Sequence, residues 1–199
     1  MRKNTGWALL GAGVAAVAGI GGYLVARERS VEQPSYRTRD KDKAIEIRDY
    51  PELLVAETTV TGAREQSLRQ GFRRLASYIF AKDRDGDKIA MTAPVLSDNH
   101  DDSRRWRTRF IMPAKLRRGS VPPTDADVQF ERIPARRVAA IRFNGKPTDE
   151  LLRDKERELR SWLAMKGYIP VGPVEHAYYN SPMVPARLRR NEVLLPLRD

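Results

Sequence analysis

The 199-residue sequence has no cysteine and only two histidines, His100 and His176. The absence of cysteine excludes disulfides, thiol catalysis, zinc–thiolate sites and lipid attachment through cysteine. None of the common hydrolase, zinc-protease or P-loop motifs occurs, and the two distant histidines suggest no nucleophile–base pair. We therefore expect a protein that binds its ligand without catalysis.

Negative charge is also scarce. The chain carries 37 Lys and Arg against 26 Asp and Glu, a net charge of +11. This balance favours anionic partners such as phosphates, anionic lipid headgroups or a ligand with carboxylates, although a solvated basic surface explains it equally well. A hydrophobic content of 41% with 32% charged residues is typical of a globular domain.

The one long uncharged run lies at the N-terminus, at Trp7–Val25, with Lys and Arg on both sides. Its length is close to the ~20 residues that cross a bilayer. We expect residues 1–30 to be a membrane anchor or, alternatively, a cleaved signal segment. The expected location is a bacterial inner membrane, with the soluble domain on either side and the periplasm favoured. Gly11–Ala16 also fits a dinucleotide-binding G-x-G-x-x-A pattern, but the flanking strand–helix context is missing.

A polar, charged stretch at 31–43 is expected to be a linker, so that residues 44–199 form the domain. Within the domain, an offset of 83 residues places Ile45–Gly62 on Val128–Gly145 without a gap. The same offset places Phe110–Pro113 on Val193–Pro196. A shared offset at both ends predicts two copies of one unit, at about 44–113 and 127–197.

Each copy is expected to contain two strands, a helix and two further strands, a ββαββ unit. The eight expected strands are Ile45–Asp49, Leu53–Val60, Ile89–Leu96, Trp106–Met112, Val128–Arg132, Arg137–Phe143, His176–Asn180 and Glu192–Leu197. They predict an α+β domain: a distorted, mainly antiparallel eight-stranded barrel with two flanking helices, preceded by the N-terminal hydrophobic helix.

The two helices are expected at 64–81 and 148–166, each with one apolar face at helical spacing. Thr148 is the expected N-cap of the second helix, and Gly167 is expected to end it. Gly71 interrupts the first helix, where glycine costs about 1 kcal/mol relative to alanine. We therefore expect Gly71 to permit close approach of the sheet or of a flat ligand.

Several segments of the domain resemble the SOUL/heme-binding-protein family. The first is Lys88–Leu96, which reads KIAMTAPVL. The others are Ile45–Val60, Trp106–Pro113, Val128–Gly145 and Tyr178–Val193. The resemblance implies a barrel of duplicated units and a ligand that is haem or another tetrapyrrole. It also implies that the ligand lies in an apolar groove beside the helix at 64–81.

Carried over residue by residue, the resemblance implies a set of binding residues on this helix and on a facing loop. They are Leu68, Arg69, Phe72, Leu75, Ala76, Ile79, Tyr178, Tyr179, Pro182 and Met183. A tetrapyrrole suits such a groove because it has a large apolar face and carboxylates for arginine. Some family members carry a proposed iron-ligating histidine where this chain has Asp49, so the metal ligand is left undetermined.

Two other classes of function remain open. An enzyme or effector-binding module for another small hydrophobic ligand would need a buried carboxylate in its pocket, and Glu57 and Asp49 are the candidates. A basic membrane-surface or nucleic-acid adaptor would use Arg-rich strands such as Arg104–Phe110. Alternation there separates the aromatic residues from the arginines, which predicts a core side and a basic solvent side. We therefore expect the membrane and a small hydrophobic anionic ligand as partners, and no nucleic acid.

Overall fold

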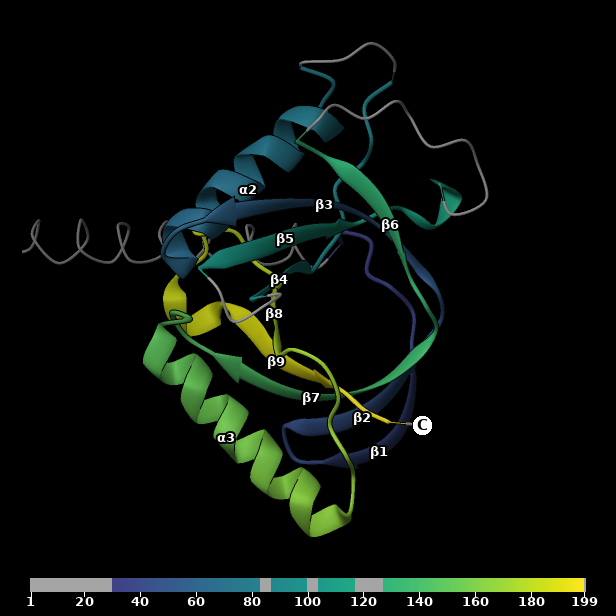
Figure 1. The fold of residues 1–199 in the computed structure, drawn as a ribbon, viewed down its shortest axis with the longest axis vertical. Coiled ribbons are helices and arrows are strands. Elements are labelled where there is room, and N and C mark those ends of the chain that lie inside the picture. The colour runs from purple at the N-terminus through teal and green to yellow at the C-terminus, as the bar shows by residue number, and fades with distance from the viewer. Residues whose placement is uncertain (1–29, 83–86, 100–103, 117–126, 199) are drawn as a thin grey trace, which may run out of the picture.

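The computed structural model describes residues 30–82, 87–99, 104–116 and 127–198. In this part, nine strands form one sheet that curls into a half-barrel, with two helices on its outer side (Figure 1). The predicted N-terminal helix lies outside the described residues. Among the described helices, none has the length and apolar content needed to cross a membrane.

The α+β class and the mainly antiparallel sheet are confirmed, with nine strands rather than eight. The strands are β1 (Arg37–Asp42), β2 (Ile45–Tyr50), β3 (Leu53–Thr61), β4 (Val95–Asn99), β5 (Arg105–Ile111), β6 (Gln129–Ile133), β7 (Arg136–Asn144), β8 (Glu175–Tyr178) and β9 (Arg190–Pro196). The helices are α2 (Arg64–Ile79) and α3 (Asp149–Lys166), with short 3-10 turns η1 (Ala114–Leu116) and η2 (Ala186–Leu188). The additional strand, β1, lies in the expected linker and pairs with β2.

The strand order is β1-β2-β7-β9-β8-β4-β5-β3-β6, and every pairing is antiparallel. Apart from β1, exchanging β2–β5 with β6–β9, strand for strand, gives the same order read in the opposite direction. The centre of this symmetry is the β4–β8 pair, where Leu96 lies opposite Ala177. Strands β2 and β6 each pair with a strand of the other half, β7 and β3 respectively.

The strand expected at Ile89–Leu96 is wrong, because β4 begins only at Val95. The preceding apolar residues are buried in a different way. Ile89 packs in the cluster under α2, whereas Ala93 packs in the cluster on the inner face of the sheet. The segment therefore crosses from one side of the sheet to the other, and Pro94, which cannot donate to a ladder, lies immediately before β4.

The outer face of the sheet is covered by the two helices, each over its own apolar cluster. Helix α2 packs on β3 and β5, and α3 packs on β7 and β9. The Leu151 amide donates to the predicted N-cap, Thr148 Oγ1, at 3.3 Å, and Gly167 ends α3 with φ 75°. A Cβ on Gly71 would lie 2.5 Å from Thr108 Oγ1, so this glycine permits close approach of α2 to the sheet.

The inner face of the curl holds a third apolar cluster, formed mainly by side chains of the strands themselves. Its members are Tyr50, Leu53, Val55, Ala93, Leu96, Ile111, Ile133, Val138, Ala140, Ala177, Tyr179 and Leu194. Unlike the outer clusters, it is bordered by buried arginines and carboxylates. The core is thus divided into two apolar layers under helices and one mixed layer inside the curl.

Candidate functional site

A surface hollow of about 400 Å³ lies beside the first half of α2. Its described lining is Ala63, Glu65, Gln66, Arg69 and Arg73. Arg69 is largely exposed and donates to Glu65 at 2.6 Å, one helical turn earlier. The hollow therefore has two arginines in its lining, and much of its surface is formed by the apolar atoms of these side chains and of Ala63.

The predicted binding residues on α2 divide between the core and the surface. Leu75 and Ile79 are fully buried against the sheet, while Leu68 and Ala76 pack partly against the same cluster. Phe72 remains 37% exposed, and its ring meets Phe110 edge-on at a centroid distance of 5.2 Å. Of the α2 residues named from the sequence, Arg69 lines the hollow and Phe72 offers an exposed apolar face on the same helix.

The predicted residues near β8 point in opposite directions, because successive residues of an extended chain alternate. Tyr178 faces outward, where its hydroxyl accepts from Arg64 at 3.0 Å. Tyr179 faces inward, donates to Glu192 at 2.9 Å and lies under the guanidinium of Arg190 at 3.7 Å. Met183 is 76% exposed on the following loop. Tyr178 and Tyr179 therefore cannot belong to one binding surface.

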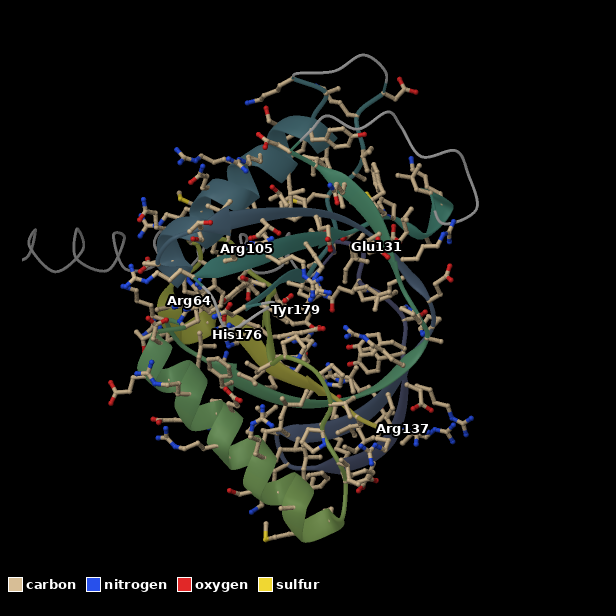
Figure 2. All side chains as sticks on the ribbon, viewed as in Figure 1. Arg64, Arg105, Glu131, Arg137, His176 and Tyr179 are labelled. Atoms are coloured by element: carbon tan, nitrogen blue, oxygen red, sulfur yellow. The ribbon has the colours of Figure 1, made fainter. Side chains whose placement is uncertain are left out.

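Arg64, the first residue of α2, joins the beginnings of the two helices. Its guanidinium binds Asp149, the Tyr178 hydroxyl and the carbonyl of Pro147. Next to this group, His176 is buried and stacked on Trp106 at a centroid distance of 6.2 Å. Burial, assisted by the positive charge of Arg64, lowers the pKa of His176 to about 4. Figure 2 shows Arg64 and His176 on the same side of the curl, with Tyr179 inside it.

The residues present fit the carboxylates of a tetrapyrrole better than its iron. None of the five described residues that line the hollow is a His, Cys, Met or Tyr, the usual axial ligands. Asp49, at the family's histidine position, lies on β2 and is bound by Arg39 and Arg137, far in sheet order from the strands under α2. No metal-binding group of three or more His, Cys, Asp or Glu occurs in the described part of the chain, and His100 lies outside it.

The inner face carries two groups of buried ion pairs. The first surrounds Glu192, which is fully buried and accepts from Arg48 at 2.7 and 3.1 Å, from Arg190 at 2.8 Å and from Tyr179. Burial alone would raise the pKa of Glu192, but its hydrogen bonds and charge interactions with Arg48 lower it overall.

The second group centres on Arg109, which binds Asp98 and lies 3.3 Å from Glu175. Arg136 donates two bonds to Glu175, at 2.6 and 2.8 Å, and Arg107 binds Asp98 at 3.0 Å. Burial opposes ionisation of Glu175, but Arg109 and Arg136 outweigh it and hold its pKa at about 2.

This group corrects the expectation of a basic solvent side on β5. The aromatic residues do face the outer side, where Phe110 meets Phe72 and Trp106 stacks on His176, and Arg105 is exposed as expected. Arg107 and Arg109, however, face the interior of the curl and are largely or fully buried. Asp98 was missed because the expected strand ended at Leu96. The alternation of Leu96 and Asp98 along β4 was the available signal for an inward carboxylate.

Comparison with known families identifies this architecture. The family model described as SOUL heme-binding protein matches residues 31–196. The chain belongs to the SOUL heme-binding protein family. No curated protein matches the sequence.

Solved structures share the fold of this SOUL protein at low sequence identity. The EcmrR C-terminal domain aligns with a TM-score of 0.61 and 16% identity, over 82% of this chain and 98% of that one. EcmrR in a DNA complex aligns with a TM-score of 0.61 and 13% identity, over 97% and 68%. A structure described as a hydrolase from Listeria innocua gives a TM-score of 0.54 and 11% identity, over 80% and 94%. These likenesses show the fold alone.

Proposed function

We propose that this SOUL protein binds haem or another tetrapyrrole, without catalysis, against the exposed face of α2. The proposal is supported by the family match over residues 31–196 together with one observation. Phe72, a half-exposed aromatic residue, lies on the same helix as Arg69 and Arg73 of the hollow. The tetrapyrrole ring would pack on Phe72, Leu68 and Ala76. Its propionates would form ion pairs with Arg69 and Arg73.

This version narrows the set of residues inferred from the sequence. Leu75 and Ile79 would stabilise the helix rather than contact the ligand, because both are buried under it. Binding would rest on apolar burial and charge-assisted hydrogen bonds, which a guanidinium forms well with a carboxylate. Iron, when present, would add the ring's own chemistry but no bond from the described lining of the hollow.

Titration of the full chain with haem and with protoporphyrin, followed by absorbance, tests this proposal. We expect saturable one-to-one binding and affinities for the two rings that agree within about tenfold, because the described lining of the hollow supplies no iron ligand. Phe72→Asp should weaken both by at least about tenfold, since it puts a charge on the apolar face. Met165→Asp, on the exposed surface of α3, is the matched control. Non-saturating binding that Phe72→Asp leaves unchanged would contradict the proposal.

We also propose that residues 1–30 attach this domain to a bacterial inner membrane. The support is the uncharged 19-residue run with basic flanks. The two halves are proposed to be copies of one ββαββ unit. The 83-residue offset and the strand pairing, which is unchanged when the halves are exchanged, support this origin.

A second candidate is an effector-binding module for another small hydrophobic ligand on the same fold. The observation that favours it is the set of buried carboxylates inside the curl: Asp98, Glu175 and Glu192. The carboxylates first considered for this role are less suitable. Glu57 is partly exposed, and Asp49 lies on the α3 side of the sheet in an ion pair with Arg137. The affinity of such a module for its ligand should not change when Phe72→Asp is introduced.

A further inference from the structure

The interior of the curl is closed by a short segment that belongs to no strand. Residues 31–36, here called the strap, precede β1 and run from the β4–β5 end of the curl toward β1 (the purple segment before β1 in Figure 1). Val31 packs on the inner apolar cluster, and Pro34 is buried. The strap therefore occupies space over the inner face that strand side chains alone leave unfilled.

The strap is held by a few dispersed contacts rather than by a ladder. The carbonyl of Glu32 accepts from the amide of Ala93 at 2.9 Å, and its carboxylate accepts from the amide of Ala114 at 2.7 Å. Gln33 accepts a long bond, 3.3 Å, from Arg190. At its end, the ring of Tyr36 lies 4.4 Å from the guanidinium carbon of Arg48. Several of these contacts are exposed side-chain contacts, so the strap can be released without unpairing any strand.

A small cavity remains beneath the strap, with a volume of about 10 Å³, close to that of one water molecule. Its walls are Pro34, Tyr50, Leu53, Pro94, Leu96, Ile111, Arg136 and Leu194. Most of this surface is apolar, and Arg136 supplies a charge at its border. Release of the strap, which includes Pro34, would open this cavity into a groove that is mainly apolar and has Arg136 at its border.

Around the groove, the buried groups that lack a hydrogen-bond partner are mainly donors. The carboxylates of Asp98, Glu175 and Glu192 are each paired with two arginines, and Glu192 also accepts a hydrogen bond from a tyrosine. By contrast, Nε of Arg109 and Nε of Arg136 are buried without a hydrogen-bond partner in the described part of the chain. The exception is Glu57, whose Oε2 accepts no hydrogen bond and forms only a long ion pair, 3.9 Å, with Arg107.

We propose that the inner face of the curl is a second ligand site, for an organic anion with a flat apolar body, and that the strap occupies this site in the structure. The apolar cluster would receive the body of the ligand, and Arg136 would bind its carboxylate or sulfonate. Ligand and strap exclude one another, so the apparent affinity is reduced by the fraction of molecules in which the strap is released. This site is separate from the proposed tetrapyrrole face of α2, on the other side of the sheet.

Fluorescence titration of the full chain with 8-anilinonaphthalene-1-sulfonate, an aromatic sulfonate, tests the site. The double change Val31→Ser, Pro34→Gly weakens the packing of the strap, and we expect it to tighten binding about tenfold or more. The matched control is Ser35→Gly, Thr38→Ser, at exposed positions of the same segment and of β1. Arg136→Leu added to the strap variant should abolish the gain, whereas Phe72→Asp should leave it.

A reversible disulfide between the strap and the sheet gives a second test, which separates release of the strap from a general loosening of the fold. Because the chain has no cysteine, the pair Glu32→Cys, Ala93→Cys, at the backbone hydrogen bond of the strap, introduces the only two thiols. With the disulfide closed, verified by thiol titration, the probe should bind at least about tenfold more weakly than to the same protein after reduction. Equal affinity in the two redox states, or a gain in the strap variant that survives Arg136→Leu, would overturn the proposal. Neither result bears on the haem titration.

Discussion

The two sides of the curled sheet solve the problem of burial differently. On the outer side, α2 and α3 cover layers that are mainly apolar. The helix α2 approaches the sheet closely because Gly71 has no side chain. On the inner side, fully buried Asp98 and Glu192 lie among arginines, with the apolar cluster between them. Buried ion pairs stabilise a fold less well than apolar residues of the same size. The inner side therefore carries charges that packing alone does not require.

Removal of one inner charge should have the largest effect. Arg109→Met keeps much of the side-chain volume but leaves Asp98 and Glu175 each without one of their partners. We expect the free energy of unfolding to fall by about 3–5 kcal/mol, measured by urea denaturation. Arg132→Met, which breaks the exposed pair with Glu52, is the control and should cost at most about 1 kcal/mol. Equal effects at the two sites would erase the distinction between the inner side and the surface.

On the outer side, buried His176 should make stability depend on pH. Its pKa is about 4 in the folded protein and about 6.5 when unfolded, so only the unfolded chain takes up a proton between these values. The free energy of unfolding should therefore fall by about 3 kcal/mol as the pH drops from 6.5 to 4. His176→Gln should remove most of this loss in denaturation curves measured across that range. A variant with the wild-type slope would assign the pH dependence to other groups.

The close packing of the outer side predicts a smaller effect at Gly71. An added Cβ lies 2.5 Å from Thr108 Oγ1, so the helix or the strand must shift. Overpacking costs about 1–3 kcal/mol, and the better helix propensity of alanine returns about 1 kcal/mol. Gly71→Ala should thus lower the midpoint of thermal unfolding by a few degrees, and Thr108→Ala should partly restore it in the double variant. An increase in the midpoint would mean that α2 has room to move away from the sheet.

The sequence predicted the outer side better than the inner side. Apolar residues at helical spacing, Thr148 and Gly167 were enough for α3, because capping and periodicity are local. The inner side depends on which strands meet. Arg109 reads as a solvent residue until β4 brings Asp98 beside it and β8 brings Glu175. The apolar run at Ile89–Pro94 likewise resembles a strand, and only the tertiary fold shows that it passes from one apolar layer to another.

The predicted binding residues follow the same division. The resemblance to the family led to α2 and to the segment around β8, and both lie beside Arg64. Alternation within the pair Tyr178–Tyr179 already implied that one of the two rings faces away from the other, but not which one faces the helices. The strap could not be anticipated, because a polar segment with one proline is typical of a linker. Its role follows from Val31 and Pro34 packing inside the curl.

The order of the strands has a consequence for how the protein is made. The last strand, β9, lies between β7 and β8 near the middle of the sheet, and β8 in turn holds β4. Among the described strands, β9 is the last to be synthesised, so β7 and β8 have no strand between them until Arg190–Pro196 has been made. Pairings between such distant parts of a chain form slowly. We therefore expect the sheet to close in a late folding step, in which β9 joins the β1-β2-β7 part of the sheet to the part that begins at β8.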